Sequence, residues 1–173
     1  MIRPATAEDL DAIVATYAEL LDYEAEHGSF SNWEKGIYPT RDYAFDVIAN
    51  GDMYVLEEDD TICASMVFSR TQAPEYADVP WKHTAPDDEV LVSRTLCIPP
   101  SQAHKHYGLR MVEYAKTYAK ILGATVIRMD IFEGNRPAQS LYAKCGFTVA
   151  GTGELALTPS TSQTQTFMEC FVG

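Results

Sequence analysis

The chain has 173 residues, of which 46% are hydrophobic and 22% are charged, and these values are typical of one globular domain that buries its own core. Thirteen basic residues against twenty-five acidic ones give a formal charge of −12, which argues against nucleic acid or an anionic membrane surface as a partner because both are polyanions. The acidic balance favours a cationic small molecule or peptide, or it serves solubility alone. We therefore expect a single domain over residues 1–173.

The sequence contains no continuous apolar stretch of the kind that a signal peptide or a bilayer-spanning helix requires. A soluble, cytoplasmic protein without a membrane partner is expected. The four cysteines, Cys63, Cys97, Cys145 and Cys170, are far apart and form no C-x-x-C pair, so neither a metal site nor a disulfide framework is predicted. The expected state is four reduced, mostly buried thiols.

Two helices are predicted before residue 52. Thr6 begins the first, whose apolar residues recur at helical spacing until about Leu21. Residues 22–40 mix glycine, serine and proline with aromatic side chains and are expected to form a loop that faces a substrate. Thr40 then caps a short second helix, which Gly51 ends by taking a left-handed conformation.

The periodicity changes to that of strands after residue 52. Residues 53–57 and 62–69 predict an antiparallel hairpin, and residues 71–88, with three prolines, predict a long irregular connection. Residues 90–98 are apolar on both faces and predict a buried central strand, which two prolines end. A helix over 108–122 and a strand over 126–131 follow, and this strand–helix–strand unit is expected to be a right-handed parallel crossover.

The last part of the chain predicts a short helix over 136–144 and a strand over 147–150. Residues 152–164 are rich in threonine, serine and glycine, and residues 166–172 predict a closing strand. This order of elements describes an α+β fold with a mixed sheet and helices on both faces.

The turn before the helix at Gly108 is a candidate phosphate site. The start of a helix presents unpaired backbone N–H groups and the positive end of the helix dipole. His104, Lys105, His106 and Arg110 surround it, a small basic cluster in an acidic chain. The alternative interpretation of this segment alone is a solvated turn.

The segment NRPAQSLYAKCGF, residues 135–147, has the features of a capped helix. Asn135 is suited to the cap, Pro137 to the first turn, and Leu141 to the core-facing side. Tyr142 then has a fixed direction near the end of the helix, although a tyrosine in such a position usually serves packing.

Together the two segments resemble the GCN5-related N-acetyltransferase (GNAT) family, whose signature is a strand, a pyrophosphate-binding loop, a helix, a strand, and then Asn-x-x-Ala, Leu-Tyr and Gly-Phe. The likeness is close over residues 89–151. Asn135, Ala138, Leu141 and Tyr142 match without a gap, as do Gly146 and Phe147. In the loop pattern Gly108 matches, whereas Ala103 and His106 depart from it.

The resemblance implies the GNAT fold and acetyl-CoA as co-substrate, with no metal. The residues it places at the cofactor are Leu96, Cys97, Ile98, Ala103, His104, Lys105, His106, Tyr107, Gly108, Leu109, Asn135, Ala138 and Tyr142. Backbone N–H groups near Cys97 and Ile98, splayed from the next strand, are expected to hold the pantetheine arm. Glycine at the position of His106 would allow the backbone to approach phosphate, so cofactor affinity is left open.

Acetyl transfer needs a proton donor for the departing thiolate and a base for the amine. Tyr142 is expected to be the donor. Glu89, at the start of the central strand, is the candidate base acting through water, with a structural carboxylate as the alternative. Cys145 has no activating histidine or aspartate at a motif spacing and is expected to pack.

The expected acceptor pocket draws on the irregular segments. Trp33, Tyr38, Tyr76 and Trp81 could line it and contact a cation, or they could pack under loops. Arg94 is the charged residue of the central strand, and it either pairs with Asp130 or contacts a ligand.

The expected function is acetyl transfer from acetyl-CoA to a primary amine of a small molecule or peptide, by direct attack in a ternary complex. The alternative is a CoA-binding sensor or assembly module with the same fold and no turnover. The sequence leaves open the acceptor amine and whether the chain forms a homodimer.

Overall fold

The computed structural model describes residues 1–158 and 161–173, and within them the side chains of residues 157, 158 and 161 are not described. The chain divides into two compact units. Unit 1 contains Met1–Ser29, Trp33–Phe68 and Thr95–Met111, and unit 2 contains Phe30–Asn32, Ser69–Arg94 and Val112–Gly173.

Unit 1 combines an antiparallel sheet with two helices. Strands β1 (Ile2–Pro4), β2 (Met53–Glu58) and β3 (Thr61–Ser69) pair in that order, although Ser69 itself belongs to unit 2. The predicted hairpin is therefore confirmed, and its turn consists of Asp59 and Asp60, both with positive φ. Strand β1 was not predicted, because three residues are too few to show a period of two.

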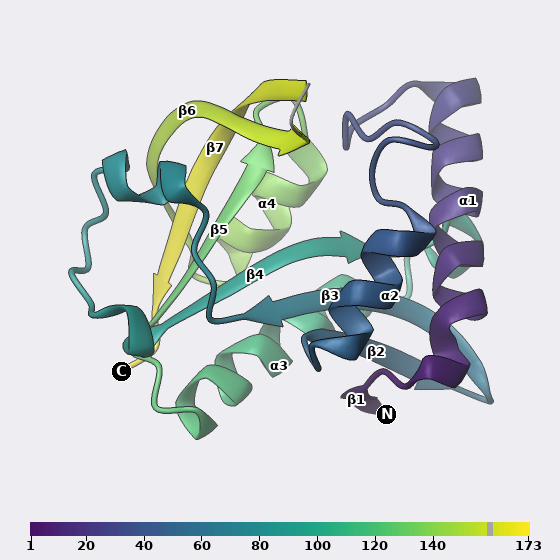
Figure 1. Ribbon diagram of the computed structural model, residues 1–173, viewed down its shortest axis with the longest axis horizontal. Helices are drawn as coiled ribbons and strands as arrows, with labels where there is room; N and C mark the ends of the chain where they lie inside the picture. The colour runs from purple at the N-terminus through teal and green to yellow at the C-terminus, as the bar shows by residue number, and fades with distance from the viewer. Residues whose placement is uncertain (159–160) are drawn as a thin grey trace. The chain divides into compact units, whose positions relative to one another are not determined.

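The helices of unit 1 are α1 (Leu10–His27), which follows a short 3₁₀ turn (Ala7–Asp9), and α2 (Arg41–Ala49); Figure 1 shows them side by side. Thr40 caps α2 by accepting the N–H of Tyr43 at 3.1 Å, as predicted. The expected end of the first helix at Leu21 was wrong. The apolar stripe fades there, but good helix formers continue the helix until Gly28, whose φ of 100° ends it.

The core of unit 1 lies between these helices and the strands. Ile13 and Tyr17 of α1 and Ala44 of α2 pack against Met53 and Val55 of β2. The side chains that α1 and α2 bury are spaced as the helical period requires, which is why the sequence indicated both helices.

Unit 2 contains the mixed part of the sheet, and Figure 1 shows its last three strands side by side. Strand β4 (Val90–Cys97, in unit 2 through Arg94) pairs in parallel with β5 (Val126–Phe132), and β5, β7 (Thr161–Phe171) and β6 (Thr148–Thr158) pair antiparallel in that order. Helix α3 (Tyr107–Ile121), whose first turns lie in unit 1, connects the parallel pair, and α4 (Arg136–Lys144) follows β5 with the predicted bounds. The predicted α+β mixed sheet is confirmed.

The C-terminal hairpin corrects the sequence-based expectation. The strand predicted over 147–150 extends as β6 to Thr158, and β7 begins at Thr161 rather than at Thr166. Threonine suits a strand, because its branched side chain packs well on a pleated surface. The richness in threonine over residues 152–164 therefore indicated strand, not loop; residues 159 and 160 of that segment lie outside the described residues.

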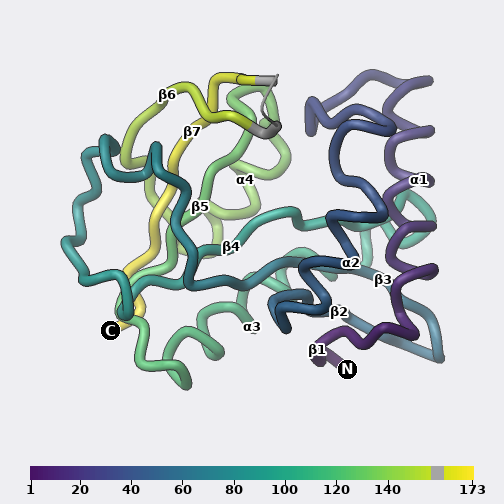
Figure 2. Tube along the Cα trace, in the orientation of Figure 1, coloured from purple at the N-terminus to yellow at the C-terminus, as the bar shows by residue number. Residues whose placement is uncertain are grey.

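The irregular connection between β3 and β4, teal in Figure 2, is confirmed and contains two 3₁₀ turns, η2 (Pro74–Asp78) and η3 (Asp87–Glu89). It is fixed to the sheet of unit 2 by the carboxylate of Glu169, which is 1% exposed. Its oxygens accept the backbone N–H groups of Lys82 at 2.6 Å and of His83 at 3.3 Å. Tyr76 also enters the core of unit 2, together with Leu155 and Phe167.

All four cysteines are free and buried. Among the described residues, no helix has the length and apolar content needed to cross a membrane.

Candidate functional site

The end of β4 departs from regular strand geometry where the pantetheine-binding residues were predicted. Thr95 has a φ of 52°, an uncommon value for a β-branched residue. The recorded pairing of β4 with β5 covers only Val90, Leu91 and Val92. Cys97 is fully buried, and its thiol donates to Thr16 Oγ1 at 3.7 Å. Leu96 and Ile98, on either side of it, are half-buried.

The loop before α3 takes two left-handed turns. His104 has a φ of 63° and His106 one of 61°, which are values that glycine adopts without steric cost. Within the described chain, no acceptor is recorded for the N–H groups of Tyr107, Gly108 and Leu109. Three free donors at the start of a 15-residue helix fit an anionic group such as a pyrophosphate.

The charges beside this helix start are partly neutralised. Arg110 forms an ion pair with Glu58, and the Tyr107 hydroxyl donates to the same carboxylate at 2.6 Å. These two contacts lower the pKa of Glu58, and the carboxylate in turn raises the pKa of Tyr107. Lys105 donates to Gln102 Oε1 at 2.9 Å. The exposed imidazoles of His104 and His106 and the Lys105 ammonium therefore remain available to a phosphate.

Thr95 forms hydrogen bonds with two tyrosines of unit 1. Its Oγ1 forms hydrogen bonds with the hydroxyls of Tyr38 and Tyr43, the latter at 2.8 Å. Trp33 stands edge-on to Tyr38, with ring centroids 5.9 Å apart. Trp33 and Tyr38, two of the four aromatic residues predicted to line an acceptor pocket, thus lie together, and the contacts of Tyr43 and Thr95 with them were not predicted.

Helix α4 fixes the direction of Tyr142. Asn135 caps the helix, and its side-chain oxygen accepts the N–H of Ala138 at 3.1 Å, as the sequence predicted. Tyr142 is 4% exposed and stands edge-on to Phe147. Its hydroxyl makes no hydrogen bond to another described residue. Burial, with smaller effects from Cys145 and Asp130, raises its pKa, so the phenol stays protonated.

Tyr76 and Trp81 come together in unit 2, with ring centroids 5.3 Å apart. The Tyr76 hydroxyl donates to Asp130 Oδ1 at 2.5 Å. From the sequence, Arg94 was expected either to pair with Asp130 or to contact a ligand. The ion pair with Asp130 is not formed, and Arg94 donates to the backbone oxygen of Thr71 at 2.9 Å. No functional part was predicted for Asp130 from the sequence.

Glu89, the predicted base, lies in η3 just before β4. Its carboxylate accepts the hydroxyl of Thr125 at 3.1 Å, and its backbone oxygen accepts the N–H of the same residue at 2.9 Å. Thr125 directly precedes β5, so Glu89 is at the N-terminal ends of the parallel pair. Strand β5 has seven residues and is about 23 Å long, and Asn135 and α4 follow its C-terminal end. Glu89 and Asn135 are therefore near opposite ends of β5.

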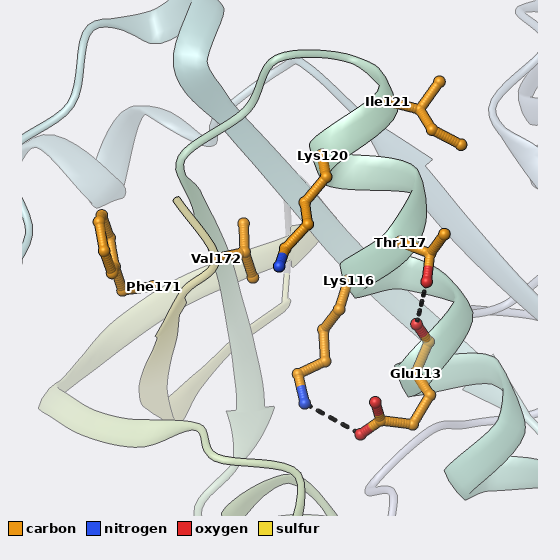
Figure 3. A pocket seen from close by; sticks show the side chains of 7 residues that line it. All are labelled: Glu113, Lys116, Thr117, Lys120, Ile121, Phe171 and Val172. Atoms are coloured by element: carbon orange, nitrogen blue, oxygen red, sulfur yellow. Dashed lines mark hydrogen bonds and ion pairs between the residues drawn. The ribbon is translucent and has the colours of Figure 1, made fainter.

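A surface groove of about 390 Å³ lies in unit 2, between the last turns of α3 and the end of β7. Figure 3 shows its lining, with Lys116 turned toward Glu113 and with Phe171 and Val172 opposite. None of the predicted site residues lines this groove. Among the described residues, no three His, Cys, Asp or Glu side chains are grouped so as to hold a metal ion.

The helix start of unit 1 has free N–H donors that suit an anionic group, and unit 2 holds a buried tyrosine whose hydroxyl can donate a proton. The family model described as "Acetyltransferase (GNAT) family" matches residues 15–147. The chain belongs to this family, and it is an acyltransferase.

Three comparisons give the context. Streptothricin acetyltransferase of Escherichia coli is 27% identical over 157 residues, covering 87% of this chain and 80% of that protein. An acetyltransferase of the GNAT family from Streptococcus agalactiae is 21% identical, with a TM-score of 0.75 over 99% of this chain and 94% of the other. The yncA protein of Salmonella typhimurium, determined with its cofactor acetyl-CoA, is 18% identical, with a TM-score of 0.69 over 100% and 94%. The two solved structures show the fold.

Proposed function

We propose that the chain transfers an acetyl group from acetyl-CoA to a primary amine of a small molecule or peptide, by direct attack in a ternary complex. The observation that carries the proposal is the helix start at Tyr107, where three N–H donors have no partner and three basic side chains lie next to them in the sequence. Acetyl-CoA supplies the activated thioester. All 173 residues would act as one domain.

The cofactor would be held by the segments that the sequence predicted. The N–H groups of Tyr107, Gly108 and Leu109, together with His104 and His106, suit the pyrophosphate. The backbone of residues 96–98, after the irregular Thr95, suits the pantetheine arm. Ala103 and Lys105 continue the same loop, and Asn135 and Ala138 begin α4.

Tyr142 would serve the departing sulfur. Its raised pKa lies above that of an ordinary thiol, so the phenol is a weak acid and a good hydrogen-bond donor toward a developing thiolate. Glu89 is the base that the sequence predicted, acting through water, and it is kept as one of two carboxylates to be tested for this role. Its test is the pH dependence of the rate in the Glu89→Gln variant, and an unchanged profile would exclude it.

The acceptor is proposed to be cationic. The formal charge of −12 favours encounter with an ammonium compound. The half-buried Trp33, Tyr38 and Trp81 are proposed to line its pocket, and Tyr76, 3% exposed in the core of unit 2, would support that lining from below. Arg94 would face an anionic part of a ligand. Streptothricin enters the set of acceptors to be tested because a relative is named for its acetylation.

The experiment is release of CoA thiol in the presence of acetyl-CoA and a panel of amines: streptothricin, polyamines, amino acids, peptides with free N-termini and lysine peptides. The expected result is thiol release with one class of amine, with the acetylated amine identified by mass spectrometry. A non-catalytic CoA-binding sensor is the second candidate. It is favoured by the histidines at two left-handed positions of the loop, and tight CoA binding without thiol release across the panel would support it.

A further inference from the structure

Asp130, in the second half of β5, carries a carboxylate that the fold does not satisfy. One oxygen, Oδ1, accepts the Tyr76 hydroxyl at 2.5 Å. No partner from another residue is recorded for the other oxygen within the described chain, and the side chain keeps partial exposure. This partly exposed oxygen is therefore open to a donor from outside the protein.

Asp130 lies beyond the paired part of the parallel strands. The recorded pairing of β4 with β5 ends at Val92 opposite Arg128, two residues before Asp130. On its other side β5 stays paired, with Asp130 opposite Phe167 of β7. The backbone of β5 at Asp130 is therefore paired with a neighbouring strand on one side, that of β7.

Four ionisable groups interact with Asp130: Tyr76 of η2 by its hydrogen bond, and Glu75 of η2, Arg94 of β4 and Tyr142 of α4 through their charge or its effect on them. Burial raises the pKa of Asp130, the Tyr76 hydrogen bond and the Arg94 charge lower it, and Glu75 raises it. The net shift is upward. A carboxyl group shifted in this direction holds a proton more readily than an exposed aspartate does.

Two neighbours of Asp130, Arg94 and Tyr142, keep groups that can act on Asp130 or on a ligand. Arg94 is held by the backbone oxygen of Thr71 at 2.9 Å, so its charge acts on Asp130 without a direct ion pair. The unpaired Tyr142 hydroxyl is close enough for the Asp130 charge to raise its pKa. A free carboxylate oxygen and a free phenol, a proton acceptor and a proton donor, thus belong to one cluster of unit 2.

We propose that Asp130 binds the ammonium group of the acceptor and takes its proton, with Tyr76 and Arg94 as positioning residues. This proposal rests on the proposed function and names the carboxylate that acts on the amine.

Each proton in the transfer has a defined donor and acceptor. The ammonium R–NH₃⁺ gives one proton to the Asp130 carboxylate and becomes R–NH₂. The amine nitrogen bonds to the thioester carbonyl carbon, the carbon–sulfur bond breaks, and the electron pair leaves on sulfur. Tyr142 gives its proton to sulfur and regains one from the new amide nitrogen. Asp130 then returns its proton to solvent, so the products are the acetamide, CoA thiol and one proton.

The test compares Asp130→Asn with Asp78→Asn, using an amine that the wild-type protein acetylates. The amide oxygen that replaces the carboxylate in Asp130→Asn can still accept the Tyr76 hydrogen bond, which preserves packing, and Asp78 is an exposed aspartate of the same η2 turn as Tyr76. We expect Asp130→Asn to lower kcat/KM by about 100-fold or more, with CoA affinity and thermal unfolding close to wild type. Asp78→Asn should match wild type in every measurement.

A second variant separates a catalytic role from a structural one. Tyr76→Phe removes a hydrogen bond that favours ionised Asp130, so the pKa of Asp130 rises. The acid limb of the kcat/KM profile should then move to higher pH by about one unit. Packing alone would not move this limb.

The outcomes are distinct. Loss of activity in Asp130→Asn together with the shifted limb in Tyr76→Phe supports the proposal. Three results would overturn the role of Asp130 and leave the proposed acetyl transfer intact. They are a wild-type kcat/KM in Asp130→Asn, an acid limb that does not move in Tyr76→Phe, and loss of the acid limb in Glu89→Gln alone. No thiol release by the wild-type protein with any amine overturns the proposed function itself, and this proposal with it.

Discussion

The left-handed backbone at His106 can be tested by comparing two replacements, His106→Ala and His106→Gly. Both remove the imidazole, and they differ only in the Cβ. At a φ of 61° an L-residue costs about 1–2 kcal/mol relative to the right-handed regions. Glycine removes this cost, but it gives the unfolded chain extra freedom that offsets about 0.4–1 kcal/mol.

The difference should leave the glycine variant more stable than the alanine variant by about 0.5–1 kcal/mol, which corresponds to a rise in Tm of about 1–4 °C for a chain of this size. Urea unfolding and thermal unfolding of the two variants, side by side, measure it. The glycine variant should also bind CoA at least as tightly as the alanine variant, because no Cβ limits the approach of phosphate.

Equal stabilities, or a more stable alanine variant, would refute the reasoning, since they would mean that residue 106 does not hold a positive φ in solution. A glycine variant that is more stable and yet binds CoA less tightly than alanine would separate the two parts of the argument. In that case the backbone conformation would be right and its part in phosphate binding wrong.

Three further predictions concern named contacts. Tyr142→Phe should lower kcat by about 10- to 100-fold with the CoA Kd unchanged, and equal turnover would remove Tyr142 from the mechanism. Glu58→Gln should tighten CoA binding about two- to fivefold at low salt, because it removes a negative charge beside the helix start and frees Arg110. The increase in affinity should disappear in about 1 M salt, and weaker binding or an increase that persists in that salt would contradict the prediction. The Arg3 guanidinium lowers the pKa of Asp9 from 3.8 to about 2, so the stability from this pair is present above about pH 4 and is lost as pH falls toward 2. Asp9→Asn should therefore destabilise the protein at about pH 6 and hardly at about pH 2, as acid-range thermal unfolding will show, and an equal loss at both would be inconsistent with the pair.

Local signals explain how far the sequence predicted the fold. The bounds of α4 followed from Asn135 and Pro137, because a cap and a first-turn proline act on their own segment. The end of α1 and the length of β6 were missed although local signals were present, because helix formers continue to Gly28 after the apolar stripe fades and threonine suits a strand as well as a loop. Residues 152–158, TGELALT, also pair with β7, and the sequence of one strand does not show which distant strand it will pair with.

Some candidate site residues could be predicted from the sequence and others could not, because only some stand out within their own segment. The helix start at Gly108 and the aromatic pairs came from residues that stand out in their own segment. Asp130 did not stand out, because an acid within an apolar strand indicates only that a partner exists and not which one. Glu58 adjoins an acidic turn, where a carboxylate with a specific contact cannot be told from a solvated one.

The burial of the four thiols has a practical consequence for the thiol-release assay on which these experiments depend. A thiol reagent attacks thiolate, and burial raises the pKa of Cys97 to about 12 and also raises the pKa of Cys145 and Cys170. The native protein should therefore consume little reagent, so the signal comes from the CoA that is released. A preparation that reacts with four equivalents per chain is unfolded, and the same colour change thus serves as a check on the sample before any amine is added.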